Sequence, residues 1–331
     1  MSTARERDTD VGGERGRTPD CYLVGQPKSG TTALFEILRQ HPQIFIPDRK
    51  EPRFFAQELF DRDPPRPGGT PKTLAEYRTW FADARDDQRV MDASPWYLWS
   101  PTSAQRIAAA RPDAQIIVVL REPASLLRSL HLQLVQLYVE AETDFQRALE
   151  LEERRRRGEE IPRHTYWPAM LMYSDHVRYV QELSRYAEHF PPEQMKILIY
   201  DDWRADNAGA VREVLRFLRV DEDVPLELRE ANPTVQVRSR HMHEMVHAVS
   251  VGHGPVSKAA KAAVKAVTPG GWRRQALYSA KRKFVFTEPD PVDDRFLREL
   301  RERYRGEVEA LGEYLGRDML SLWGYAPADG S

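Results

Sequence analysis

The segment that most constrains the fold lies near the amino terminus, where an apolar run passes through a short loop into a helix. Residues Cys21–Gly25 form an apolar run that predicts a buried strand. Apolar residues at 34, 37 and 38 predict one buried face of a helix over 31–39. Because proline disfavours helical geometry in the residue before it, His41-Pro42 is expected to end this helix. A strand, a glycine-containing loop and a helix in this order are typical of an α/β protein that binds a phosphate group.

The alternation of strands and helices continues along the chain. The β-branched run Gln115–Leu120 has the continuous apolar character of a central parallel strand. Strands that alternate with helices imply a parallel sheet covered by helices. We therefore expect an α/β fold, a parallel β-sheet flanked by helices with a P-loop-like nucleotide-binding core and a helical carboxyl-terminal part. The other predicted strands are 90–91 and 195–200, and the other predicted helices are 102–110, 124–139, 208–218 and 293–315.

Composition and length bound the class of protein. Residues 1–19 are charged and lack an apolar stretch, so they are predicted to be a disordered segment and not a secretory signal. A single domain is expected over residues 20–327. The lone cysteine, Cys21, excludes an intrachain disulfide and favours a reducing, cytoplasmic location. No run of eighteen apolar residues predicts a membrane span, and a net charge of −2 gives no reason to expect a nucleic-acid partner.

The loop after the first strand has the residues that a bound phosphate group needs. Backbone N–H groups at the start of a helix are unpaired and lie at the positive end of the helix dipole. Glycine lets the backbone approach an anion closely, lysine adds a full charge, and threonine hydroxyls donate hydrogen bonds. The alternative is an ordinary turn with a capping threonine. The candidate phosphate-binding residues are Pro27, Lys28, Ser29, Gly30, Thr31 and Thr32.

A nucleoside triphosphatase loop is the nearest alternative motif. Gly25 and Gly30 have the spacing of the pattern GxxxxGK[ST], but Thr31 stands where that pattern requires lysine. The lysine lies inside the loop instead, at position 28. Since no strand ends in an acidic residue suited to magnesium, the sequence argues against ATP hydrolysis.

The run PKSGTT at residues 27–32 resembles the 5′-phosphosulfate loop of sulfotransferases that use 3′-phosphoadenosine 5′-phosphosulfate (PAPS). The continuation, with His41-Pro42 and Lys50–Phe55, is most similar to the carbohydrate branch, such as the heparan sulfate sulfotransferases. The resemblance implies transfer of a sulfuryl group from PAPS to a hydroxyl or amine of a carbohydrate or small-molecule acceptor (EC 2.8.2 type). In that branch a glutamate three residues before a Phe-Phe pair is the catalytic base, and Glu51 stands at that place. Lys28 is then expected to stabilise negative charge on the leaving phosphate.

A second anion site is predicted at the end of the central strand. Arg121 follows that strand directly, at the edge where ligands of such sheets bind, and Ser129 lies eight residues further on in the next helix. The resemblance makes both residues ligands of the nucleotide's 3′-phosphate; alternatively they are a surface arginine and an ordinary helix serine. Residues 232–239 resemble bacterial members of the family, which leaves Arg238 and Arg240 as candidates to complete this site. The arginine–lysine–glycine clamp of cytosolic members is absent here.

A competing motif predicts a different chemistry. His243, Glu244 and His247 fit the zinc-protease pattern HExxH, and His253 stands near the place of a third ligand. Ser250 replaces the glycine that this pattern needs, and no Met-turn follows. Sulfuryl transfer itself is expected to need no metal, because the sulfuryl group carries less charge than a phosphoryl group. A zinc metallohydrolase and a non-catalytic nucleotide-binding protein remain the alternative functions.

The acceptor site is less well marked. Trp96, Tyr97 and Trp99, or residues 166–167, either form a flat wall for a sugar ring or pack in the core. His131 is a possible substitute base. The basic stretch over 256–283 either meets an anionic acceptor or a membrane surface, or is a solvated face. The run Glu152–Arg157 is predicted to be a solvated helix face.

Overall fold

The computed structural model describes residues 16–59, 70–163, 165, 167–228 and 291–325, together with the backbone of 236–237 and 286–287. The described residues group into two compact units. The first unit lies within Met1–Glu122, His176–Ala231 and Glu307–Met319, and the second within Pro123–Asp175, Asn232–Gly306 and Leu320–Ser331. The expected single domain over 20–327 and its disordered lead-in stay predictions.

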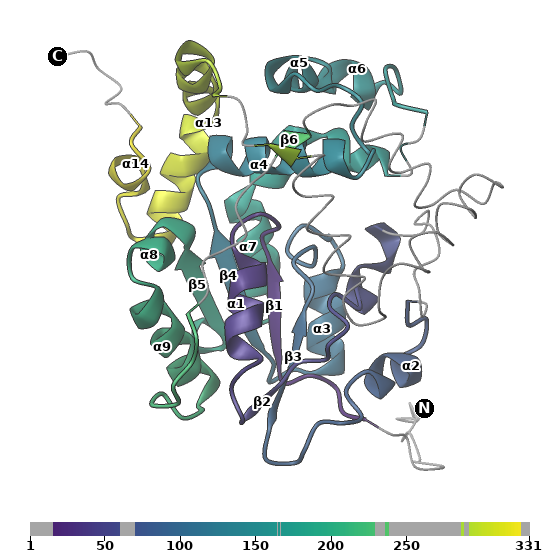
Figure 1. Ribbon diagram of the computed structural model, residues 1–331, viewed down its shortest axis with the longest axis vertical. Coiled ribbons are helices and arrows are strands. Elements are labelled where there is room, and N and C mark those ends of the chain that lie inside the picture. Colours follow the sequence, from purple (N-terminus) through teal and green to yellow (C-terminus); the bar gives the residue numbers. More distant parts are fainter. Residues whose placement is uncertain are drawn as a thin grey trace, which may run out of the picture. The chain divides into compact units, whose positions relative to one another are not determined.

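The first unit is built on a five-stranded parallel sheet (Figure 1). The strand order is β2-β3-β1-β4-β5, and each neighbouring pair runs parallel. The predicted parallel α/β fold with flanking helices is thus confirmed. The strands are β1 (Cys21–Gly25), β2 (Ile44–Phe45), β3 (Arg89–Ala93), β4 (Gln115–Leu120) and β5 (Met195–Ile199).

Short helices of the first unit connect and cover these strands. The predicted helices after the first and fifth strands are present with nearly the expected bounds. These elements are α1 (Thr31–Leu38), η1 (Phe54–Leu59), α2 (Leu74–Thr79), α3 (Ser103–Ala110), α7 (Tyr179–Ala187), η4 (Pro192–Gln194), α8 (Tyr200–Ala205) and α9 (Asn207–Leu218).

The sheet has a different set of neighbours on each face, because successive strand side chains alternate. Cys21 and Leu23 of β1 join one buried cluster with apolar side chains of α1, α8 and α9. Tyr22 points to the opposite face, where its ring meets Phe55 at a centroid distance of 5.9 Å. Both faces of β1 are therefore buried, which explains why its sequence is continuously apolar.

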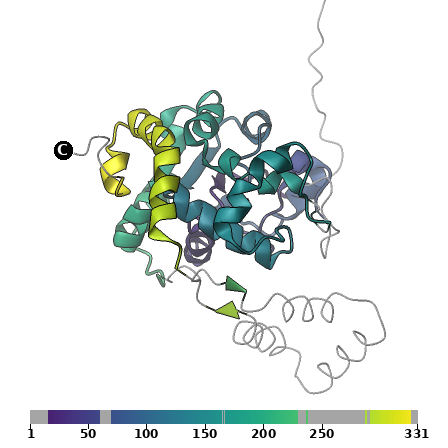
Figure 2. The same ribbon diagram turned by 90° about the horizontal axis from the view of Figure 1, so that it is seen from above.

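The second unit is helical with one small ribbon. The two-residue strands β6 (Gln236–Val237) and β7 (Phe286–Thr287) pair antiparallel and lie side by side in Figure 2. Its helices are α4 (Pro123–Gln136), α5 (Phe145–Glu150), α6 (Glu152–Arg156) and η2 (Pro168–Leu171). The elements η3 (Tyr173–Val177), α13 (Asp294–Leu315) and α14 (Met319–Leu322) contribute residues to both units.

The structure corrects the prediction that Glu152–Arg157 is a solvated face. The run does form a helix, α6, but Arg155 is almost completely buried. Its guanidinium forms a two-pronged ion pair with Glu140 at 2.7 and 2.8 Å, and Tyr173 Oη donates to the same carboxylate at 3.0 Å. A buried charge needs such a partner, and Glu140 is too far away in the sequence for the run itself to reveal it.

The bounds of two predicted strands also differ from those in the structure. Tyr200 was expected to end the fifth strand, but β5 ends at Ile199 and Tyr200 begins α8. The strand predicted at 90–91 is present and extends over Arg89–Ala93, so it includes Asp92. Neither β2 nor α8 was predicted, because each is too short to show a periodic pattern.

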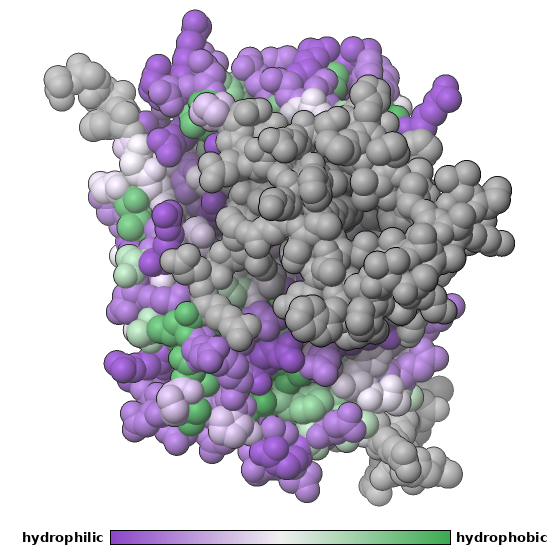
Figure 3. All heavy atoms as spheres, viewed as in Figure 1, coloured by the Kyte–Doolittle hydropathy of each residue, from purple (hydrophilic) through white to green (hydrophobic). Residues whose placement is uncertain are grey.

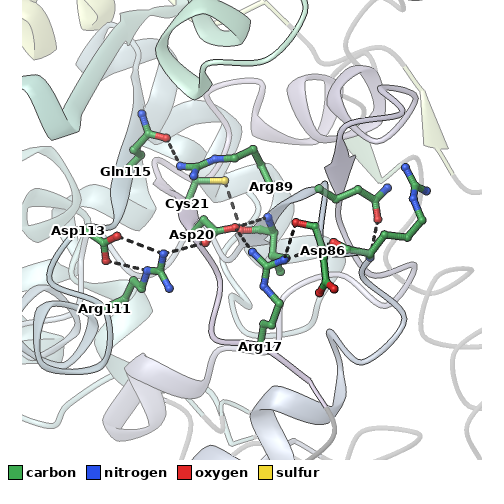
Figure 4. Close-up of polar contacts among 11 residues, drawn as sticks. Arg17, Asp20, Cys21, Asp86, Arg89, Arg111, Asp113 and Gln115 are labelled. Carbon is green, nitrogen blue, oxygen red and sulfur yellow. Dashed lines mark hydrogen bonds and ion pairs between the residues drawn. The ribbon is translucent and has the colours of Figure 1, made fainter.

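A network of charged side chains lies at the amino-terminal ends of the central strands (Figure 4). Asp20, directly before β1, accepts hydrogen bonds from Arg17 at 3.0 Å and from the Val90 backbone N–H at 2.9 Å. Its other oxygen lies 3.0 Å from Arg111, which also pairs with Asp113. We call Arg17, Asp20, Arg111 and Asp113 the amino-edge network. It gives each of its cations a carboxylate partner.

The described surface is largely polar. Hydrophilic residues cover most of the described part of the face shown in Figure 3. The exposed large hydrophobic side chains of the described residues are Leu137, Leu228 and Tyr314. Within that part of the chain, no helix combines the length and the apolar composition that a membrane crossing requires.

Candidate active site

The loop between β1 and α1 requires glycine at its last position. Gly30 caps α1 with a φ of +87°, in the left-handed region that glycine adopts without strain. A Cβ atom at this position would lie 2.5 Å from the ring of Trp203 and 3.1 Å from that of Tyr200. The two aromatic side chains of α8 therefore pack directly against the backbone of the loop.

Gln26 anchors the beginning of the loop. Its backbone N–H donates to the Val119 carbonyl of β4 at 2.8 Å. Its side-chain amide donates to Glu182 Oε2 at 3.1 Å and to the His176 carbonyl at 3.2 Å. Burial raises the pKa of Glu182 to about 8, so this anchor is a neutral carboxyl group at neutral pH.

Lys28 is a desolvated cation. Its backbone adopts a φ of +67°. Burial, followed by repulsion from Arg121 and Lys50, lowers the pKa of Lys28 to about 8. Within the described residues no carboxylate pairs with its ammonium group, and the adjacent Ser29 hydroxyl is buried without a hydrogen-bond partner. Unpaired polar groups of this kind are expensive unless a ligand completes them.

Arg121 lies against the same loop. Its guanidinium donates to the Lys28 carbonyl at 2.9 Å and lies 4.8 Å from the centroid of the Tyr200 ring. Tyr179 Oη fixes the Arg121 backbone by donating to its carbonyl at 2.6 Å. The Nε atom of Arg121 is buried without a partner. The structure thus brings Arg121 and Lys28, which are distant in the sequence, together in the first unit.

Glu51 is held between two cations. Its Oε2 accepts hydrogen bonds from Arg53 at 2.9 and 3.3 Å, and its Oε1 lies 3.8 Å from Lys50 Nζ. The Glu51 side chain is 22% exposed, so it is a paired, partly buried carboxylate and not a fully solvated one. Both Glu51 and Arg53 have left-handed backbones, with φ of 60° and 57°. Such strain persists only where the surroundings over-determine it, and it is common at functional sites.

A buried carboxylate, that of Asp92, supports this strained segment through hydrogen bonds. Asp92 accepts hydrogen bonds from the hydroxyls of Ser94, Tyr77 and Tyr97 at 2.7 to 2.8 Å. Ser94 Oγ in turn accepts the Arg53 N–H at 3.2 Å, and Tyr97 Oη accepts the Phe55 N–H at 3.4 Å. Burial raises the pKa of Asp92 to about 6. Tyr97 is therefore buried and supports this segment. Of the two roles predicted for it, a wall for a sugar ring or packing in the core, the structure favours packing in the core.

We call Lys28, Lys50, Glu51, Arg53 and Arg121 the carboxyl-edge cluster, because β1 and β4 end beside it. Sequence reasoning singled out Lys28, Glu51 and Arg121 as site residues but assigned no role in the site to Lys50 or Arg53. The supporting roles of Tyr200, Trp203 and Asp92 were missed, since no local pattern marks a residue that acts through the backbone of another segment.

The other predicted site residues lie on several different elements. Ser129 is buried on α4 in the second unit. Thr31 is buried and Thr32 is exposed at the start of α1. Trp96 is buried, whereas Trp99 and Trp167 are half-buried. Outside the described residues lie Arg238, Arg240, Tyr166, the histidines of the zinc pattern and the basic stretch over 256–283.

His131, the possible substitute base, lies in the second unit. Its Nε2 donates to the Glu142 carbonyl at 2.9 Å, and burial lowers its pKa. It lines a cavity of about 200 Å³ together with Phe145 and Phe296. Across the described ranges no group of three or more His, Cys, Asp or Glu side chains is arranged to hold a metal ion.

Comparison with known proteins gives a consistent family. A sequence profile of the sulfotransferase family matches residues 19–223. Heparan sulfate glucosamine 3-O-sulfotransferase 3A1 of Mus musculus is 29% identical over 200 residues, which cover 60% of this chain and 45% of that protein. Heparan sulfate glucosamine 3-O-sulfotransferase 6 of Homo sapiens is 35% identical over 111 residues, or 34% of this chain and 29% of that protein.

A solved structure shares the fold. The crystal structure of a sulfotransferase from Alicyclobacillus acidocaldarius aligns with a TM-score of 0.65 and 24% identity, over 93% of this chain and 99% of the other. The chain spans less than half the length of the first curated relatives that it matches.

Proposed function

The chain belongs to the sulfotransferase family, and from this premise we propose that it transfers a sulfuryl group from PAPS to a hydroxyl or amine of an acceptor. One observation carries the proposal: Lys28 and Arg121 meet at one loop, and neither has a carboxylate partner within the described residues. Two cations without counter-ions at a helix start form a site for an anionic ligand.

The residues of this site fit a sulfonated nucleotide. The donor has anionic groups at both ends, so it suits a loop that offers backbone N–H groups, an ammonium group and a guanidinium group. The buried Ser29 hydroxyl and the Arg121 Nε atom still lack partners and are available for its oxygens. Gly30 has no side chain at the point where the backbone of the loop packs closely against the rings of Trp203 and Tyr200. We assign Pro27 to Thr32 and Arg121 to the nucleotide, with Ser129 and Arg238 as further proposed ligands of the 3′-phosphate.

Three residues of the cluster have distinct roles in the proposed transfer step. Glu51 takes the proton from the acceptor group, a step that contributes about 10²–10⁴-fold to the rate. Arg53 binds the Oε2 atom of that carboxylate and so fixes its orientation. Lys28 stabilises the negative charge that develops on the leaving phosphate. The Asp92 network fixes the backbone on which Glu51 stands.

The names of the relatives support a proposal for the acceptor class. The matched mammalian proteins are named for a glucosamine of heparan sulfate, so we propose a carbohydrate hydroxyl as the first acceptor to test and a small-molecule hydroxyl as the second. The chemical step is the same for the carbohydrate and the small-molecule acceptor, because each offers an O–H group whose proton Glu51 can take.

The experiment measures transfer from labelled PAPS to a panel of polysaccharide and phenolic acceptors. We expect Glu51→Gln to lower kcat by about 10²-fold or more while the affinity for 3′-phosphoadenosine 5′-phosphate (PAP) is unchanged. Glu193→Gln, which changes an exposed carboxylate of the same unit, is the matched control and should leave kcat unchanged.

Each other result has a definite meaning. Full activity of Glu51→Gln would exclude it as the base. Binding of PAP without transfer to any acceptor would indicate a non-catalytic nucleotide-binding protein. One zinc ion per chain that is lost in His243→Ala would instead favour the metallohydrolase.

A further inference from the structure

Lys50 lies between the two halves of the carboxyl-edge cluster. Its Nζ donates to Thr32 Oγ1, in the first turn of α1, at 2.8 Å. The same atom lies 3.8 Å from Glu51 Oε1 and 5.3 Å from the centroid of the Phe35 ring. The ammonium group therefore stands next to the helix that begins at the phosphate-type loop and next to the proposed base.

The charge balance around Lys50 is incomplete. Glu51 is the one carboxylate of the described residues that forms an ion pair with it, and Arg53 already binds the other oxygen of Glu51 more closely. Burial lowers the pKa of Lys50, and Lys50 in turn helps to lower the pKa of Lys28. Lys28 and Lys50 are two partly desolvated ammonium groups near each other, and of the two only Lys50 is paired with a carboxylate of the described part of the chain. Such a pair creates a strong local preference for an anion.

A purely structural role does not explain a lysine here. A hydrogen bond to the Thr32 hydroxyl can be made by a neutral side chain, which would avoid the cost of desolvating a charge. The left-handed backbone of Glu51 sets the direction of the segment that carries the side chains of Lys50 and Glu51. The hydrogen bonds around Asp92 hold that segment in place. The charge of Lys50 is thus positioned at a fixed point between the loop and the base.

We propose that Lys50 is a further catalytic residue, whose ammonium group binds a non-bridging oxygen of the sulfuryl group during transfer. The inference rests on the proposed function. In that step a bond forms between the acceptor oxygen and sulfur, and the bond between sulfur and the oxygen bridging to the 5′-phosphate breaks. The electron pair remains on the bridging oxygen, and the acceptor proton goes to Glu51.

The timing of the charges fits this role. When Glu51 takes the proton, its carboxylate becomes neutral and no longer attracts Lys50. The ammonium group then interacts fully with the negative oxygens of the group in transfer, while Lys28 serves the leaving phosphate. An interaction that strengthens in the transition state raises kcat, and not only the affinity for the substrate.

The test compares the affinities for PAPS and PAP, because only PAPS carries the sulfuryl group. We expect Lys50→Met to weaken PAPS binding by about 10-fold, to leave PAP binding unchanged and to lower kcat by about 10²-fold. Lys50→Arg should recover part of kcat, since it restores the charge. Lys72→Met, which removes an exposed lysine of the same unit, is the matched control and should change none of these values.

Two outcomes would overturn the proposal: an unchanged kcat in Lys50→Met, or an equal loss of affinity for PAPS and PAP. The second would place Lys50 on the phosphate or in a purely structural role. Failure of the proposed function looks different, because the unsubstituted protein would then neither prefer PAPS over ATP nor transfer its sulfuryl group. Melting temperatures of all variants identify any that fail to fold.

Discussion

The two ends of the central strands of the first unit are both rich in charge, but they use it differently. At the amino-edge network, Asp20 accepts hydrogen bonds from Arg17 and a backbone N–H and forms an ion pair with Arg111, which also pairs with Asp113 (Figure 4). At the carboxyl-edge cluster, Lys28 and Arg121 have no carboxylate partner in the described residues. The backbone differs as well, because Lys28, Glu51 and Arg53 all have positive φ.

This difference separates charges that hold the fold from charges that await a ligand. A compensated network lowers the free energy of the folded protein, whereas uncompensated cations on a strained backbone raise it. We expect substitutions at the amino edge to change stability but not activity, and substitutions at the carboxyl edge to do the reverse.

The largest effect is expected for Lys28→Ala. Transfer should fall by about 10³-fold and PAP should bind at least about 10-fold more weakly, since the charge next to the leaving phosphate is lost. The melting temperature should stay constant or rise, because a desolvated cation has been removed. Calorimetric scans and steady-state kinetics measure both; a lower melting temperature would assign Lys28 to the fold.

Gly30→Ala tests how closely the loop packs. Its Cβ would lie 2.5 Å from Trp203 on a backbone with φ of +87°, so we expect a loss of about 2–3 kcal/mol in the free energy of unfolding. Gly158→Ala is the matched control, because Gly158 has a φ of +81° but no neighbour within 4 Å. It should cost only about 1 kcal/mol. Equal losses in urea denaturation would show that α8 does not constrain the loop.

Asp20→Ala tests the opposite edge. Removing the shared acceptor of Arg17 and Arg111 should lower the free energy of unfolding by about 2 kcal/mol, a value moderated by the partial exposure of both arginines. The kcat and the PAP affinity of the folded protein should stay unchanged. A loss of kcat at full folding would remove the functional distinction between the two edges.

The last prediction concerns the buried Glu182, whose effect appears only as a dependence of stability on pH. Its pKa in the folded protein, about 8, is above the ordinary value of 4.5, so the folded state holds a proton that the unfolded state releases. Its contribution to stability is complete below pH 4.5 and declines as the pH rises to about 8. Glu182→Gln should therefore show a flatter decrease of melting temperature between pH 5 and pH 8 than the unsubstituted protein. Parallel curves would mean that Glu182 is ionised in the fold.

The sequence revealed those parts of the site that depend on local order. The run Cys21–Gly25, the loop and α1 are consecutive, so their apolar pattern and the glycine were enough to predict strand, turn and helix. Arg121 was found for a similar reason, since it follows the most regular strand of the chain. In both cases a general rule places ligands at the carboxyl ends of parallel strands.

What the sequence did not reveal depends on distant partners. The buried pair of Arg155 and Glu140 turned a charge run into part of the core. The hydrogen bond from Arg53 to Glu51 depends on the left-handed backbone of both residues. Neither residue is a glycine, so the sequence gives no sign of this conformation. Asp92 fixes that contact through hydroxyls of other segments. Such roles become visible only when the tertiary contacts are known.

The most direct measurement is the thermal stabilisation of the protein by PAP and by ATP, each at the same concentration. A ligand at 100 times its Kd stabilises the folded state by about 2.7 kcal/mol, and only a ligand that fits both anion sites should do so at low concentration. We expect PAP to raise the melting temperature, ATP to raise it far less, and Arg121→Ala to abolish the difference. Equal stabilisation by both nucleotides, or none by PAP, would contradict the assignment of the carboxyl-edge cluster to a sulfonated nucleotide.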